Sequence, residues 1–344
     1  MKSKAKFLSV KDTTISFLEF VKKFSTEYKA FVYLEKLRWG ETGIICPFCG
    51  EIITYSCNRK RERGYHECSK CHKVFTVRTG TIFERSHVPM TKWLYTCYKV
   101  ITARKGISSV QLAVEIGVTQ KTAWFMLQRI RYSYSANSIN LGKLREIVEV
   151  DGAYFGGSEK CKHKNKKRNI GRGCIGKLCV LGMKQRKGNV KAVVIHETDK
   201  ATVHGVMDSH IEKDSTVMTD EAKVYEGIKF GVHGIVTHSQ SEYVKGEFST
   251  NEIESVWAIL KRGWKGIYHH MSPKHLQLYV NEYCFRLNDG RCEKQLDERI
   301  KSLCGFAIGS SHMTYEELVS RSGSNLLMRA AWVTCKEGGS AKIL

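Results

Sequence analysis

Residues 147–157 read IVEVDGAYFGG, an apolar strand that ends at a carboxylate, Asp151. Three further stretches have strand character; they are KLCVLGMKQR (177–186), VKAVVIHET (190–198) and STVMTD (215–220). A helical pattern lies at 201–212 between the last two of these, and a long helix is expected from about Thr250. Strands with helices packed around them predict an α/β domain with a mixed sheet over residues 147–295.

The remainder of the chain divides around this domain. Residues 1–40 predict a helical segment, and residues 41–88 predict short strands around a cluster of cysteines. Residues 89–135 predict further helices, the first of them opened by a proline. The polar residues 136–146 are interpreted as a linker, and residues 296–344 as a C-terminal extension.

Acidic residues occur at the ends of two predicted strands and near the start of the later helix: Asp151, Asp220 and Glu254. Strand ends and a helix can bring such side chains together on one side of a sheet. Two divalent ions, Mg²⁺ or Mn²⁺, about 4 Å apart need a carboxylate cluster of this kind, because hard cations prefer oxygen ligands. Lys261 lies two helical turns after Glu254 on the same face, where its ammonium can reach a phosphate.

Other residues compete for this role. Glu149 lies on the same strand face as Asp151, Glu221 is adjacent to Asp220, and Glu252 precedes Glu254. Asn251 is a second candidate for the third ligand. The residues alone leave this choice open.

Four cysteines form two C-x-x-C pairs: Cys46, Cys49, Cys68 and Cys71. Such pairs supply four thiolates from two tight turns, which predicts one structural zinc ion. Cys57, His66 and His72 lie nearby, but none has a partner at this spacing. The loop between the pairs carries basic residues suited to phosphate contacts, namely Arg59, Lys60, Arg61 and Arg63.

The composition favours a polyanionic partner. Lys and Arg number 56 against 34 Asp and Glu, a formal net charge of +22, which promotes nucleic-acid binding by phosphate neutralisation. The 13 cysteines are odd in number, and no secretory signal or long apolar stretch is evident. We therefore expect reduced thiols, no membrane association and a cytoplasmic, nucleoid-associated location.

Residues 108–116 and 119–134 match a helix-turn-helix, with the turn at Gly117. Ser108 or Ser109 can cap the first helix, and Thr119 the second. At the start of the second helix, three residues are expected to meet base edges: Gln120, Lys121 and Thr122. Basic flanks support this interpretation, namely Arg104, Lys105, Arg129 and Arg131. A second basic turn, between the first two strands of the α/β domain, contains Lys164, Lys166, Lys167 and Arg168.

Several blocks together resemble a known family. DGAYFGG, TDEAKVYEG and TNEIESVWAILKRGWKG look like the three catalytic blocks of bacterial insertion-sequence DDE transposases related to the eukaryotic Merlin elements. The upstream ICPFCG and YHECSKCHKVF resemble the zinc ribbon of that group. The similarity extends over roughly residues 15–320. It implies an RNase H-like fold, metal-dependent cleavage at element ends and strand transfer.

The resemblance assigns Asp151 and Asp220 as the first two metal ligands. In this group an Asn can stand where other families have Glu, and this chain offers both Asn251 and Glu254. Glu254 is favoured, because Lys261 follows it by two turns and a charged ligand binds Mg²⁺ better. The expected partners are double-stranded terminal inverted repeats and target DNA, with a homodimer or higher oligomer joining two ends. The alternatives are an RNase H-like nuclease or resolvase without strand transfer, or an inactive transposase-derived DNA-binding regulator.

Overall fold

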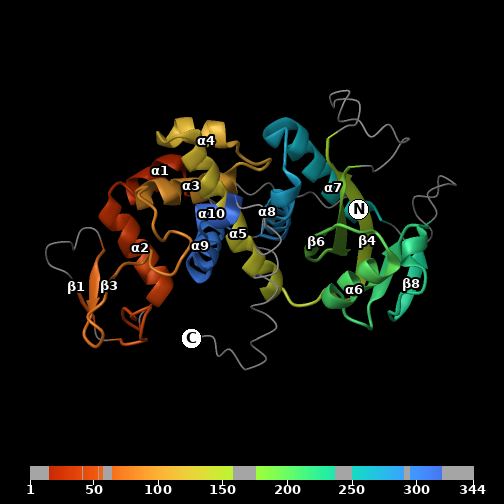
Figure 1. The fold of residues 1–344 in the computed structure, drawn as a ribbon, viewed down its shortest axis with the longest axis horizontal. Helices are drawn as coiled ribbons and strands as arrows, with labels where there is room; N and C mark the ends of the chain where they lie inside the picture. Colours follow the sequence, from red (N-terminus) through yellow and green to blue (C-terminus); the bar gives the residue numbers. More distant parts are fainter. Residues whose placement is uncertain are drawn as a thin grey trace, which may run out of the picture. The chain divides into compact units, whose positions relative to one another are not determined.

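The computed structural model describes residues 15–40, 42–52, 54–56, 64–157, 176–236, 250–289 and 295–319, and Figure 1 shows its elements. The chain forms two compact units. Unit 1 comprises residues 1–136 and 289–344, and unit 2 comprises residues 137–288. Both ends of the chain therefore contribute to unit 1. Among the described residues, the helices lack the combination of length and apolar character that crossing a bilayer requires.

Unit 1 is mainly helical. Its helices are α1 (Phe17–Lys23), α2 (Glu27–Trp39), α3 (Met90–Thr102), α4 (Ser109–Ile116), α5 (Gln120–Asn140, which runs past the unit boundary), α9 (Leu296–Gly309) and α10 (Tyr315–Val319). Ser16 forms a capping box at the start of α1, and Pro89 precedes α3 as expected. The C-terminal α9 packs against α2 and α3, so the core of this unit joins segments from opposite ends of the sequence.

Unit 1 also contains a small antiparallel sheet in the order β1-β2-β3. Its strands are β1 (Thr54–Ser56), β2 (His66–Cys68) and β3 (Val74–Phe75). Short strands around the cysteines agree with the sequence expectation. The sheet is tied to α2 by a buried contact of 2.8 Å between His66 Nε2 and Glu35 Oε1.

Unit 2 is built on a five-stranded mixed sheet in the order β6-β5-β4-β7-β8. The strands are β4 (Ile147–Phe155), β5 (Leu178–Gln185), β6 (Val190–Ile195), β7 (Thr216–Thr219) and β8 (Val232–Ile235). The pairs β4–β5 and β5–β6 are antiparallel, whereas β4–β7 and β7–β8 are parallel. Strand β4 is therefore central and pairs with neighbours of both directions.

Helices cover both faces of this sheet (Figure 1). The elements outside the sheet are α6 (Lys200–His210), the 3-10 turn Lys223–Tyr225, α7 (Asn251–Gly263) with its π-helical extension Trp264–Tyr268, the 3-10 turn Pro273–His275, and α8 (Leu276–Asp289). Alternate residues of β4 face opposite cores. Ala153 and Phe155 pack with α7 and α8, while Val148 and Val150 pack with α6. This alternation places Asp151 on the α7 face.

Three features differ from the sequence expectation. Asp151 does not end its strand, because β4 continues to Phe155 in antiparallel pairing with β5. Strand β8 was not expected, since it has four residues and a glycine, Gly234, and so lacks a strong apolar alternation. Helix α5 continues to Asn140, into the segment interpreted as a linker, since the first Gly or Pro of that segment is Gly142, two residues after the helix ends.

Gly182 of β5 permits the close approach of α7 to the sheet. A Cβ atom at this position would lie 2.5 Å from Trp257 Cζ2 and 2.8 Å from Ile253 Cδ1. Gly182 pairs directly with Asp151 across the β4–β5 ladder. The missing side chain thus leaves room for the Trp257 ring beside Asp151.

We expect Gly182→Ala to destabilise unit 2 by about 1–3 kcal/mol, the usual cost of overpacking a core. Hydrogen exchange of the β4–β5 ladder amides measures this cost for unit 2 separately from unit 1. Gly157→Ala is the matched control, because a Cβ there meets nothing within 4 Å. Equal exchange protection in the two variants would contradict the packing argument.

Candidate functional site

Two aspartates occupy equivalent positions beside two parallel strands, Asp151 within β4 and Asp220 directly after β7. The ladder between these strands ends with the pair Glu149 and Met218. Asp151 and Asp220 each lie two residues beyond that pair, so continuing the same register sets them side by side. A backbone turn fixes the second carboxylate, because the Ala222 amide donates to Asp220 Oδ1 at 3.1 Å.

Helix α7 brings a third acid and a lysine to the same place. An open pocket of about 430 Å³ in unit 2 is lined by Asp151, Asp220, Thr250, Glu254, Trp257, Ala258 and Lys261. Thr250 donates from its Oγ1 to Glu254 Oε1 at 3.3 Å. Four of the residues singled out in the sequence therefore meet in one pocket. Asn251 is exposed and does not belong to the pocket lining.

The carboxylates of this pocket influence one another. Burial raises the pKa of Asp151, and the charges of Asp220 and Glu254 raise it further. Hydrogen bonds from the Gly152 amide (2.7 Å) and from Trp257 Nε1 (2.9 Å) oppose that rise. A set of repelling carboxylate oxygens is the donor chemistry that hard divalent cations prefer, and a bound cation relieves the repulsion. The pocket residues therefore fit a magnesium or manganese site.

The competing acids lie elsewhere. Glu149 is completely buried, with Arg186 Nη2 3.2 Å from its Oε1. Glu252 lies 3.3 Å from Lys184 Nζ, and Glu221 is exposed. None of these three acids lines the pocket.

Two aromatic residues beside the aspartates had no assigned role at the site in the sequence analysis. Trp257 is buried and donates from Nε1 to Asp151 Oδ2. Tyr225 is also buried, and burial raises the pKa of its hydroxyl, with the charges of Asp220 and Asp151 adding to the rise. The sequence signal for both was their place in stretches that resemble the transposase family: Tyr225 lies in TDEAKVYEG, and Trp257 lies in TNEIESVWAILKRGWKG.

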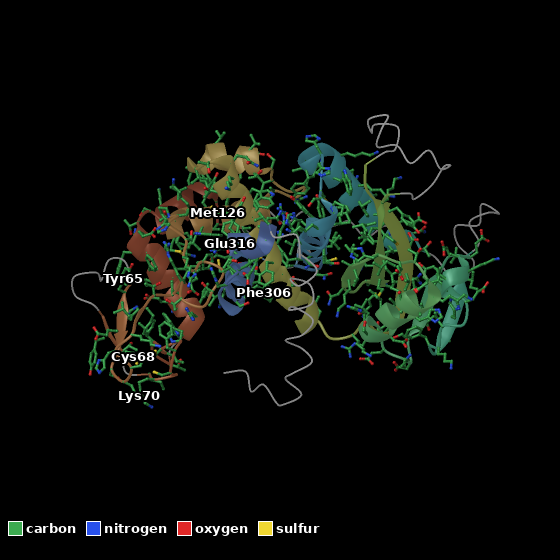
Figure 2. The ribbon with its side chains drawn as sticks, viewed as in Figure 1. Tyr65, Cys68, Lys70, Met126, Phe306 and Glu316 are labelled. Carbon is green, nitrogen blue, oxygen red and sulfur yellow. The ribbon has the colours of Figure 1, made fainter. Side chains whose placement is uncertain are left out.

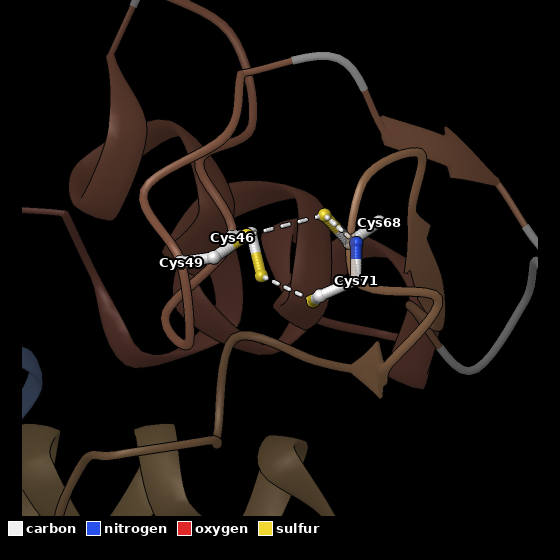
Figure 3. A group of neighbouring side chains, drawn as sticks. All are labelled: Cys46, Cys49, Cys68 and Cys71. Atoms are coloured by element: carbon white, nitrogen blue, oxygen red, sulfur yellow. Dashed lines mark hydrogen bonds between the residues drawn. The ribbon is translucent and has the colours of Figure 1, made fainter.

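The four cysteines of the two C-x-x-C pairs converge, as Figure 3 shows. Their Sγ atoms all lie within 4.8 Å of one another. The Cys46–Cys71 and Cys49–Cys68 sulfur atoms are 3.7 and 3.5 Å apart. A tetrahedral site with Zn–S bonds of about 2.3 Å needs sulfur atoms about 3.8 Å apart, so the cluster fits a zinc ion.

Local hydrogen bonds favour the thiolate form of Cys68 within this cluster. The amides of Cys71 and Lys70 donate to Cys68 Sγ and lower the pKa of that thiol. His66 pairs with Glu35 outside the cluster. His72 is exposed and lies 3.8 Å from Glu67.

Helices α4 and α5 are joined by the short turn that the sequence suggested. Ser108 accepts the Gln111 amide at the start of α4, Gly117 adopts a left-handed conformation at its end, and Thr119 accepts the Thr122 amide at the start of α5. These contacts match the expected caps.

The three expected base-reading residues are solvent-accessible but already have intramolecular contacts. Gln120 donates to Ser109 at 2.7 Å, Thr122 hydrogen-bonds Thr119, and Lys121 Nζ lies 4.6 Å from the centre of the Tyr315 ring. Tyr315 belongs to α10; Figure 2 labels the next residue of this helix, Glu316, and also Met126 of α5. The start of α5 thus contacts the C-terminal part of unit 1.

Two basic residues expected as DNA-facing flanks have a structural role instead. Arg129 and Arg131 are buried. Arg129 donates to the carbonyl oxygens of Ile82, Glu84 and Met313. Residues 126–131 of α5 are all buried, so the helix is enclosed on every side at this point, which a count of basic residues does not reveal. The other two flanking residues, Arg104 and Lys105, are exposed. The basic residues expected in the two loops lie outside the described residues: Arg59, Lys60, Arg61, Arg63, Lys164, Lys166, Lys167 and Arg168.

Comparisons with known proteins agree with this arrangement. Residues 143–288, which include the pocket, match the ISXO2-like transposase domain. Residues 25–74, which include the four cysteines, match the transposase zinc-ribbon domain. The first matched segment covers most of unit 2, and the second includes the cysteine cluster of unit 1.

A protein from Halobacterium salinarum described as an uncharacterized protein in transposable element ISH50 is 28% identical over 280 residues. The aligned region covers 77% of this chain and 92% of that protein. Among solved structures, the Mos1 strand transfer complex matches 61% of this chain and 77% of its own, with 10% identity. Its TM-score of 0.18 is too low to bear on the fold. On the two domain matches, the chain belongs to the insertion-sequence transposases that combine a transposase zinc ribbon with an ISXO2-like transposase domain.

Proposed function

We propose that this transposase cuts and joins DNA at the unit 2 pocket, with two divalent metal ions held by Asp151, Asp220 and Glu254. The observation that supports this most directly is the shared pocket of these three carboxylates and Lys261. That pocket lies within the segment that matches the transposase domain. The proposal takes Glu254 rather than Asn251 as the third ligand, because Asn251 is not part of the pocket lining.

Each pocket residue has a defined task in this proposal. When bound, the two metal ions activate the attacking oxygen and stabilise the leaving oxygen. Trp257 Nε1 donates to one oxygen of Asp151 and the Gly152 amide donates to the other, and each carboxylate oxygen keeps further acceptor capacity for a metal ion. Lys261 lines the pocket as a cation on the Glu254 face of α7, where it is suited to neutralise a phosphate of the bound strand.

The reaction proceeds in two balanced steps. Water attacks the phosphodiester at the element boundary, the P–O3′ bond breaks, and the element keeps a free 3′-hydroxyl. That hydroxyl then attacks a target phosphodiester, so a new P–O bond forms and a target 3′-hydroxyl leaves. Joining two element ends in this way calls for at least a dimer on DNA.

We also propose an RNase H-like fold for unit 2. The supporting feature is a sheet in which three antiparallel strands, β6, β5 and β4, continue into the parallel strands β7 and β8. Asp151 lies within β4, and Asp220 directly follows the adjacent parallel strand β7. Helix α7 supplies the third acid from above one face.

Unit 1 is proposed to bind the terminal inverted repeats. It contains the cysteine cluster that fits zinc and the capped helix pair α4–α5. Gln120, Lys121 and Thr122 would reach base edges after exchanging the intramolecular contacts described above for contacts with DNA. The formal charge of +22 for the whole chain supports a large electrostatic share in DNA affinity.

Replacing Asp220 tests the catalytic proposal. We expect Asp220→Asn to lower Mg²⁺- or Mn²⁺-dependent cleavage of a duplex carrying the element ends by more than about a hundredfold, the upper range for outer-shell changes. Binding of the same duplex should stay within about threefold, because phosphate contacts elsewhere dominate affinity. Gel-based cleavage and binding assays measure both.

Glu221→Gln is the matched control, because it removes an adjacent exposed acid that does not line the pocket. It should keep wild-type cleavage. A wild-type protein without metal-dependent cleavage, or an active Asp220→Asn variant, would rule out the proposed site. Strand transfer from a duplex with a pre-formed 3′-hydroxyl end separates a transposase from a nuclease that only cuts.

The zinc proposal is tested by metal content. Purified protein should contain about one zinc ion per chain, measured by inductively coupled plasma mass spectrometry. Cys46→Ser should lose this zinc and weaken DNA binding, because one of four tetrahedral ligands is gone. Cys97→Ser serves as the control, since Cys97 is buried in α3 outside the cluster. Equal zinc content in both variants would contradict the assignment.

A further inference from the structure

Glu149 caps helix α7 from a distant strand. Its buried Oε2 accepts hydrogen bonds from the backbone amides of Glu252 (2.9 Å) and Ile253 (3.1 Å). These amides belong to the first turn of α7, whose own N-cap residue, Thr250, makes no side-chain capping bond. An anion at the amide end of a helix compensates unsatisfied N–H groups and interacts favourably with the helix dipole.

The same face of β4 holds α7 at a second point. Two residues after Glu149, the Asp151 carboxylate accepts from Trp257 Nε1 at 2.9 Å. The two strand positions are separated by about 6.7 Å, from the rise per residue of a strand. The contacted helix positions, Ile253 and Trp257, are separated by about 6 Å along the helix axis. The separation of the two contacts along the strand is therefore nearly the same as their separation along the helix axis.

Glu254 lies between these two points of attachment. It follows Ile253 directly and precedes Trp257 by one turn, and its side chain lines the pocket. A slide or rotation of α7 along β4 would break either the Glu149 contacts or the Trp257 contact. The separation of Glu254 from Asp151 is thereby set by the pair of contacts and by the space at Gly182.

The negative charge of Glu149 is balanced within the fold. Arg186 Nη2 lies 3.2 Å from its Oε1, so the buried carboxylate has a cation and two amide donors. A second acid at the same helix end, Glu252, is partly exposed and contacts Lys184 Nζ at 3.3 Å and the Lys187 amide at 3.2 Å. The carboxylates of both acids lie near the start of α7, Glu252 from the helix itself and Glu149 from β4. The Glu252 and Ile253 amides donate to Glu149.

We infer that Glu149 is a positioning residue, which holds α7 so that Glu254 and Asp151 are set at the separation a shared metal pair requires. The inference rests on the proposed function of the pocket. It assigns Glu149 no contact with metal or DNA. Its effect reaches the metal site through the backbone of α7.

Two substitutions of full-length protein test this role. Glu149→Met keeps the side-chain length and removes both acceptor oxygens, and Glu149→Gln keeps one oxygen but removes the charge. We expect Mn²⁺ affinity and the kcat of cleavage to fall by about 10–100-fold in Glu149→Met, as for outer-shell partners of metal ligands. The loss in Glu149→Gln should be about three- to tenfold on the same basis. The KM for DNA should change little in both.

Glu252→Gln is the matched control, because it removes a charge from the same helix end without uncapping it, and its Mn²⁺ affinity should match wild type. A merely structural role would lower the melting temperature of the Glu149 variants and leave the Mn²⁺ affinity of the folded protein unchanged. Isothermal titration with Mn²⁺ alone, well below the melting temperature, measures that affinity.

The outcomes distinguish a failure of this inference from a failure of the proposed function. If the wild-type protein is active and Glu149→Met keeps the wild-type Mn²⁺ affinity and kcat, the inference is overturned and the proposed function is left intact. If Glu149→Met does not fold, the same decision falls to Glu149→Gln, and unchanged values there overturn the inference. Wild-type protein that neither binds Mn²⁺ nor cleaves DNA removes the proposed function and the inference with it.

Discussion

The contact between strand β4 and helix α7 is the constraint on which the geometry of unit 2 depends. One face of β4 presents two carboxylates, and α7 hydrogen-bonds to both of them. The helix can lie this close only because β5 has a glycine, Gly182, where the Trp257 ring rests. A charged side chain buried for this purpose is costly to desolvate, and its amide and guanidinium partners compensate that cost. Packing and electrostatics thus act on the same few side chains.

Features with a local signal could be predicted from the sequence. The spacing of the C-x-x-C pairs predicts a four-cysteine cluster, and the capping residues on either side of Gly117 predict the turn there. The start of β4 at Ile147 agrees with the apolar pattern, whereas its end at Phe155 lies four residues beyond the expected end at Asp151. Asp151, Asp220 and Glu254 line one pocket, and their meeting there agrees with the expectation from strand ends and helix start.

Features that depend on distant partners could not be predicted. Glu149 looked like a rival metal ligand, because nothing near it in sequence reveals two amides more than a hundred residues away. Arg129 looked like a DNA contact, because its carbonyl partners come from three separate segments. Strand β8 exists through its pairing with β7 rather than through its own composition. In each case tertiary contacts outweigh local pattern.

The composition of unit 1 from both chain ends has a consequence for synthesis on the ribosome. Helix α9 packs on α2 and α3, and the Met313 carbonyl is a partner of Arg129. Helix α9 must therefore leave the ribosome before this unit can close its core, whereas unit 2 is continuous in sequence, precedes α9 and is available earlier. Domains fold as units once their parts are present. The unit that carries the cysteine cluster therefore completes its core only after unit 2 has been synthesised, and a translation product that stops before α9 would leave that core unfinished.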